Sequence, residues 1–173
     1  MIPFHTKFPE LLETETRVYT TVGDPDLPDG SYAFVEFFCD DPGCDCQRVM
    51  INVISKDHPG KVFATIGYGW KEKDFYRRFM GSGKYPVPEN ELKGPYLDPL
   101  NRQSKYAPKF MKIFEKLLED REYEERLERH YLMFKKAVHE DRKTGGKGGR
   151  SAKSKTKAKR KRKLAKAKRR KNR

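Results

Sequence analysis

The sequence has no apolar run long enough for a membrane span. A transmembrane helix needs about 20 mostly apolar residues, and no run of about 18 occurs here. The N-terminus, MIPFHTKFPELLETET, has no basic segment followed by an apolar one, so no secretory signal is read. These absences predict a cytoplasmic chain that does not bind a membrane.

The sequence has few cysteines, and all of them are in one place. Cys39, Cys44 and Cys46 are the only three in 173 residues. An odd, clustered set without a signal peptide argues against a disulfide framework and for a reducing compartment.

Acidic residues are absent after Asp141. Residues 1–141 hold 21 Lys and Arg against 25 Asp and Glu, a formal charge of −4, whereas residues 142–173 hold 18 Lys and Arg and no acid. This second segment also has no aromatic residue and a single leucine, Leu164. Such a composition cannot bury enough apolar surface to offset the entropy of ordering. We therefore predict a folded domain over 1–141 and a disordered Lys/Arg-rich tail over 142–173.

The first part of the chain is rich in patterns typical of β-strands. Alternating or β-branched runs cover four segments, and the loops between the later ones are too short for parallel crossovers. The predicted strands are 14–22, 31–38, 48–55 and 61–70. This arrangement predicts a four-stranded antiparallel meander.

Helical patterns follow the strands. A short helix is expected over 72–80, a proline-rich loop over 81–108, and strongly helical sequence over 109–140 with a bend or a new start at Asp120. Packing the helices on one face of the sheet would bury the apolar side of both. The fold class is therefore predicted as α+β.

The stretch FCDDPGCDCQR places the cysteines around one predicted turn. Pro42-Gly43 fits a type II turn between two strands, and three thiols held at such a turn resemble part of a tetrahedral zinc site. The alternative is that Cys39 is a buried core residue and the other two cysteines are incidental. The clustering favours a metal site, with zinc as the expected ion.

A closed site needs a fourth ligand, and His130 is the histidine best placed to supply it. Its spacing from Leu127 and Phe134 puts it on the flank of an apolar helix face. His139 is expected to be solvated, and His58 lies in a hairpin loop at the opposite end of a strand. The alternatives are that His130 is only a hydrogen-bonded core residue, or that an oxygen ligand comes from Asp40, Asp41 or Asp45. With three protein ligands, water would take the fourth place and catalysis would become conceivable.

Several segments together resemble a family of uncharacterised bacterial proteins. They are YAFVEFFCDDPGCDCQRVMINVI, YGW with FY close behind it, LKGP and RLERHYLMF, and the resemblance covers about residues 14–138. The family carries the same F-C-x-x-P-x-C-x-C block, and its members often end in a SEC-C motif, a short zinc-binding tail. The resemblance implies that the three cysteines act as a unit. No SEC-C ligand set occurs after residue 141, where the basic tail stands instead.

Signals for known enzyme classes are weak. GSGKY lacks the first glycine and the final Ser or Thr of a phosphate-binding loop, and the H-x-E of zinc deaminases does not occur. An aromatic set could form a platform for bases, but its strand and helix spacing favours core packing. Its members are Tyr68, Trp70, Phe75, Tyr76 and Phe79.

The tail predicts a polyanion partner. Lys and Arg that neutralise phosphates release counterions, which gives binding that is indifferent to sequence and weakens with salt. The alternatives are that residues 142–173 serve to keep the protein soluble or act as an import signal. The residues expected to bind nucleic acid are Lys157, Lys159, Arg160, Lys161, Arg162, Lys163, Lys166, Lys168, Arg169, Arg170 and Lys171.

The sequence thus predicts a non-enzymatic zinc-binding module that its tail anchors to nucleic acid, with RNA or ribosomes favoured over DNA, which stays an alternative. The alternatives are a metal-dependent enzyme with an open cysteine-ligated zinc, and a protein–protein adaptor that uses the aromatic surface.

Overall fold

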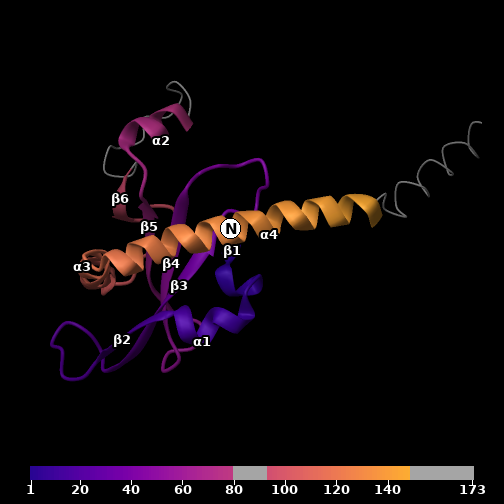
Figure 1. Ribbon diagram of the computed structural model, residues 1–173. Coiled ribbons are helices and arrows are strands. Elements are labelled where there is room, and N and C mark those ends of the chain that lie inside the picture. The colour runs from indigo at the N-terminus through magenta and orange to yellow at the C-terminus, as the bar shows by residue number, and fades with distance from the viewer. Residues whose placement is uncertain (80–92, 149–173) are drawn as a thin grey trace, which may run out of the picture. The chain divides into compact units, whose positions relative to one another are not determined.

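The computed structural model describes residues 1–79 and 93–148 and is shown in Figure 1. It is an α+β fold built on one antiparallel sheet. The strands are β1 (Ile2–Pro3), β2 (Arg17–Thr21), β3 (Gly30–Phe38), β4 (Arg48–Ser55), β5 (Val62–Gly69) and β6 (Gly94–Leu97).

The sheet has six strands where the sequence predicted four. The order is β1-β3-β4-β5-β6, and β2 also pairs with β3. Strands β1 and β2 share one edge of β3, because Pro3 pairs with Phe37 and Arg17 pairs with Phe34. Strand β6 lies in the segment expected to be a loop. Both missed strands are short and contain proline, so neither has the alternation by which strands are recognised.

The short helices near the N-terminus are η1 (Phe4–Thr6), η2 (Pro9–Leu11) and α1 (Leu12–Glu15), and the others are α2 (Lys73–Phe79), α3 (Ala107–Leu118) and α4 (Arg121–Gly148). Helices α2, α3 and α4 lie close to where the patterns placed them, whereas the short N-terminal helices were not predicted, and residues 14 and 15, expected to begin a strand, belong to α1. The break predicted at Asp120 is confirmed. Its side chain accepts a hydrogen bond from the backbone N–H of Glu122 at 3.1 Å, which caps the start of α4.

Helix α4 continues past the predicted end of the folded domain. It reaches Gly148, so residues 142–148, assigned to a disordered tail, are helical. The rest of the tail, including all eleven residues expected to bind nucleic acid, lies outside the described residues. The chain divides into two compact units, Met1–Ala137 and Val138–Arg173, and the sites described below belong to the first unit.

The core lies between the sheet and helices α3 and α4. Along β3 every second side chain points inward, and Phe34 and Phe38 are almost fully buried. Phe34 stacks on Phe114 of α3 with ring centroids 6.2 Å apart, and Phe38 contacts Phe134 of α4 at 5.5 Å. This alternation fixes which β3 residues meet the helices. Within the described part of the chain, no helix is both long enough and apolar enough to cross a membrane.

Candidate metal centre

The three cysteines lie together at one end of the sheet. Cys39 directly follows β3, and Cys46 comes two residues before β4, so the antiparallel pairing of these strands brings their ends close. The Sγ atoms of Cys39, Cys44 and Cys46 all lie within 4.8 Å of one another, and each side chain is half-buried. A tetrahedral centre with metal–sulfur distances of about 2.3 Å has sulfurs about 3.8 Å apart. The group is therefore close enough to hold a metal ion.

A tight turn shapes the loop between the cysteines. The N–H of Cys44 donates to the carbonyl of Asp41 at 3.2 Å, and the N–H of Gly43 donates to the Asp41 carboxylate at 2.8 Å. The turn closes where the sequence predicted it. It is not type II, because Gly43 lacks the positive φ that this type requires. The left-handed residue of the loop is instead Gln47, with φ of 46°.

Helix α4 holds this loop at both ends. The Tyr131 hydroxyl donates to the carboxylate of Asp45 at 2.9 Å and accepts from the N–H of Gln47 at 3.3 Å. One turn later, the buried Lys135 donates its Nζ to the carbonyl of Asp41 at 2.7 Å. These bonds fix the backbone on each side of Cys44 and Cys46, so the cysteine group is positioned by its surroundings.

Helix α2 supports the loop from another side. The Tyr76 hydroxyl donates to the carbonyl of Gln47 at 2.8 Å and accepts from the N–H of Lys71 at 3.2 Å. Its ring lies so close to Gly69 that a Cβ there would collide with it. Glycine at position 69 therefore lets the ring reach the residue that follows Cys46.

Burial and mutual proximity raise the pKa of two of the thiols, those of Cys44 and Cys46. Burial, with a hydrogen bond to Cys39 and its charge, raises the pKa of Cys44. Burial, followed by the charges of Cys44 and Cys39, raises the pKa of Cys46 to about 12. A cation at the centre reverses this balance, because a metal binds the thiolate form and releases the protons.

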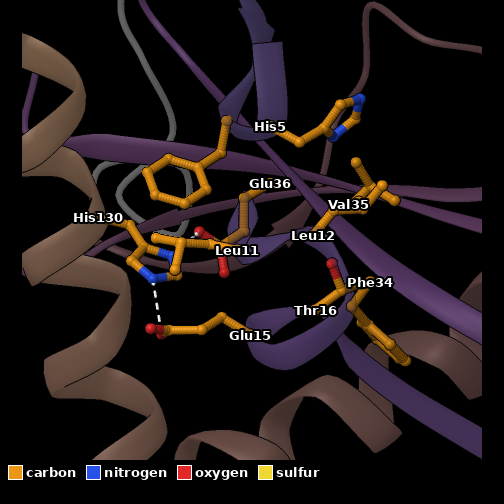
Figure 2. Close-up of a pocket in the computed structure, with 10 residues that line it drawn as sticks. His5, Leu11, Leu12, Glu15, Thr16, Phe34, Val35, Glu36 and His130 are labelled. Carbon is orange, nitrogen blue, oxygen red and sulfur yellow. Dashed lines mark hydrogen bonds and ion pairs between the residues drawn. The ribbon is translucent and has the colours of Figure 1, made fainter. Parts of the chain in front are cut away.

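His130 is not brought to the cysteines. Its Nδ1 lies 2.7 Å from Glu36 Oε2, its Nε2 lies 2.9 Å from Glu15 Oε2, and its ring stacks on Phe4 with centroids 4.1 Å apart. Figure 2 shows the ring between the two carboxylates. The prediction that His130 faces the interior is confirmed, since it is 1% exposed. Both nitrogens already have partners, so the structure does not assign His130 as the fourth ligand.

The two glutamates explain this placement. Each ring nitrogen faces a carboxylate oxygen, Nδ1 that of Glu36 and Nε2 that of Glu15, so both ligand atoms of the imidazole are engaged. Glu36 stands at an inward position of β3, between Phe34 and Phe38, where the pattern otherwise calls for an apolar residue. A carboxylate at such a position is a sequence signal for a buried cationic partner, although it does not say which one.

Other candidate ligands are also engaged elsewhere. Asp40 pairs with the N-terminal amine at 3.2 Å, and the carboxylates of Asp41 and Asp45 accept the loop and Tyr131 bonds described above. The His58 ring lies 5.6 Å from that of Phe63, and His139 is exposed on α4. Among the described residues, only the three cysteines form a group that could hold a metal ion.

Two members of the aromatic set belong to the core, as its spacing favoured. Tyr68 and Tyr76 are buried, and Trp70 is half-buried with its ring 5.4 Å from that of Tyr131. Phe75 is half-buried, and nothing is described of the Phe79 side chain. Two of the five rings are thus unavailable to a base or to a protein partner without unfolding.

Comparison with protein-family models, with curated proteins and with solved structures finds no match to this chain.

Proposed function

We propose that Cys39, Cys44 and Cys46 hold a zinc ion that stabilises the fold, and that the Lys/Arg-rich tail anchors this module to nucleic acid. The observation that carries the proposal is the convergence of all three thiols within 4.8 Å, on a loop that two helices hold in place. Thiolates are soft ligands that select zinc over calcium or magnesium. A structural role fits a site so firmly tied to the surrounding backbone.

The ligand count favours a second candidate, a metal-dependent enzyme with an open coordination position. Three described protein ligands leave one place for water or for another exogenous ligand. Against catalysis, three thiolates offset the charge of the cation and weaken it as a Lewis acid. The carboxylate nearest in the chain, Asp45, already accepts a hydrogen bond from Tyr131. We therefore prefer the structural role.

Metal analysis of the purified full chain tests the first half of the proposal. We expect about one zinc per chain, as a site with tetrahedral thiolate ligands implies, and a lower thermal midpoint after removal by a chelator. Cobalt in place of zinc then separates the two candidates. An absorption change on addition of a small thiol would indicate an exchangeable fourth position. A fully folded wild-type preparation without any metal would end the proposal.

The charge partition supports the nucleic-acid half. The domain is mildly acidic and the tail carries all of the excess positive charge. Phosphate carries no base information, so binding should be nearly independent of sequence, with RNA or ribosomes as the favoured target. Six to ten phosphate contacts would weaken binding by about 10³–10⁵ between about 50 and 200 mM salt.

Two truncations test the tail. One ends after Asp141, as the charge boundary suggests, and the other ends after Gly148 and keeps α4 whole. We expect both to lose RNA and DNA binding while retaining zinc, measured by filter binding across the salt range. If the longer truncation binds nucleic acid as tightly as the full chain, the nucleic-acid site lies in the folded domain and not in the tail.

A further inference from the structure

A groove of about 720 Å³ lies on the sheet beside the turn that joins β4 to β5, and side chains from β2, β3, β4 and β5 line it. The strand register explains its floor. Val18 pairs with Ala33, Ala33 with Ile54, and Ile54 with Val62, so their side chains form one apolar row across the strands. Ala33 precedes the inward-facing Phe34, which places the row on the face opposite the helices.

The side chains of this row are open to solvent. The exposed fractions are 53% for Val18, 39% for Ile54 and 38% for Val62. The solvated face of an antiparallel sheet normally carries polar residues. Apolar side chains that gather on an exposed surface instead are typical of an interaction site. The groove therefore has the character of a contact surface, with its floor accessible to a partner.

The ionisable residues in the wall of the groove are two exposed lysines, Lys56 and Lys61. Within the described part of the chain, neither pairs with a carboxylate, and the Lys61 ammonium lies 4.4 Å from the centroid of the Phe63 ring. Asp57 follows Lys56 in the chain, but its carboxylate accepts a hydrogen bond from the Ser55 hydroxyl at 3.3 Å and does not line the groove. The charge of the wall is therefore positive.

The combination of an apolar row and positive charge selects the kind of partner. The row has no aromatic side chain on which a base could stack, so nucleic acid would gain nothing from it. The chain's own segment 142–173 is positive, and the two lysines would repel it. Four adjacent strands span about 14 Å, which is the length of about four or five extended residues. The row thus matches a short peptide segment with acidic and apolar residues.

We propose that this groove docks a segment of a partner protein that carries two or more large apolar side chains next to acidic residues. The apolar side chains cover the row from Val18 to Val62, and the carboxylates pair with Lys56 and Lys61. The inference does not depend on the metal centre or on the tail, so each can fail without the other.

Titration of the full-length protein at physiological salt tests the proposal. The probe is an acetylated and amidated hexapeptide of alternating leucine and glutamate. Backbone amide shifts of residues 18, 33, 54 and 62 report binding in the groove, and those of 142–173 report attraction of glutamate to the tail. We expect a saturable response in the groove. A peptide with serine in place of leucine should shift only the tail amides.

Variants of the apolar row assign the response to the groove. Val18→Thr and Ile54→Thr keep β-branched side chains, which suit a strand, but add a hydroxyl. We expect each to weaken binding of the leucine–glutamate peptide in the groove by about fivefold, because less apolar surface is buried. Val22→Thr is the matched control, since Val22 is 84% exposed and lies outside the groove, and it should bind as the wild type does.

A charge reversal tests the lysines. Lys56→Glu should weaken binding of this peptide by about threefold to fivefold. It should strengthen binding of the peptide with lysine in place of glutamate, which a general loss of structure would not do. Lys112→Glu, exposed on α3, is the control and should change neither affinity. Circular dichroism verifies that each variant is folded.

The proposal is overturned if the groove amides give no saturable response, or if the serine peptide shifts them as strongly as the leucine peptide. It is also overturned if Val18→Thr and Ile54→Thr both retain wild-type binding. Groove shifts that appear on concentrating the protein alone would show that a second copy covers the row, which would replace the proposed partner.

Discussion

Two groups of side chains lie near the same end of β3, the three cysteines and His130 with its two glutamates, and they differ in what their polar atoms already contact. Cys39 lies three residues after Glu36 in the sequence. Tyr131, which bonds to the cysteine loop, directly follows His130 on α4. The three Sγ atoms lie within 4.8 Å of one another. The histidine has a carboxylate on each ring nitrogen. The thiols therefore remain available to a cation, whereas both nitrogens of the histidine are already engaged by carboxylates.

The comparison shows that a residue near a candidate metal site is not necessarily one of its ligands. His130 has the buried position expected of a fourth ligand, on the helix that holds the cysteine loop. The alternation of β3 nevertheless presents Glu36 to it, and burying that carboxylate demands a charged donor. Electrostatic pairing within the core thus determines the role of His130.

The largest effect is expected from Cys46→Ser, which removes one of the three cysteine thiolates proposed to bind zinc. We expect loss of bound zinc and a decrease of about 4–5 kcal/mol in the free energy of unfolding, because the binding energy of a structural metal contributes to folding. Metal analysis and denaturant unfolding measure the two effects. Chelator-treated wild type is the reference and should approach the stability of the variant. Full zinc retention in Cys46→Ser would remove Cys46 from the site.

His130→Gln tests the other side of the comparison. We expect zinc to be retained, with a loss of about 3 kcal/mol in stability, because the buried Glu36 and the half-buried Glu15 lose the imidazole that pairs with them. His139→Gln, exposed on the same helix, is the matched control and should change neither quantity. Zinc loss in His130→Gln alone would show that His130 leaves its glutamates to bind the metal.

Tyr131→Phe tests whether the helix positions the cysteine loop. The change removes the hydroxyl that bonds to Asp45 and Gln47 but preserves the ring. We expect zinc affinity to fall by about tenfold, as is usual when groups that orient the ligands are lost. Competition with a chromophoric chelator measures the affinity. Tyr19→Phe, on a strand remote from the loop in sequence, should leave it unchanged.

The smallest effect is a change with pH in the stability that Glu15, one of the two glutamates paired with His130, contributes. Burial raises the pKa of Glu15, but the hydrogen bond and charge of His130, together with Arg129, outweigh it and lower the pKa below 4.5 overall. A lowered folded-state pKa contributes stability that is fully present above pH 4.5 and is lost as pH falls through the folded value. Glu15→Gln should therefore be less stable than wild type at neutral pH, and the difference should shrink in acid. Unfolding midpoints across pH measure it, and a constant difference would contradict the assignment.

The sequence predicted those parts of the fold that depend on local pattern. Alternation located β3, β4 and β5, and the change in apolar spacing located the break at Asp120. Strands β1 and β6 were missed because they join the sheet through backbone bonds at its edges, which leave little trace in side-chain type. The continuation of α4 through 142–148 was missed because low apolar content was taken to exclude helix.

The sequence predicted which residues of the candidate site lie together or face inward, but not which distant residues they contact. The cysteine cluster and the inward face of His130 follow from spacing alone. The identity of the group that meets His130 does not, because Glu15 lies 115 residues away and Glu36 lies 94 residues away. Periodicity determines which way a side chain faces but not which distant segment it will meet. The buried glutamate in an apolar strand was the one signal available for this contact.

The contacts of His130 also bear on the order in which the chain folds. This residue joins three segments: the N-terminal turns through Glu15, strand β3 through Glu36, and helix α4 itself. The hairpins β3–β4–β5 close short loops and can form early, whereas joining residues 15 and 130 requires closing most of the domain. We therefore expect the N-terminal turns to complete their contacts late and to open early in local unfolding. Amides of η1, η2 and α1 should exchange with solvent well before those of β4, although His130 itself is deeply buried.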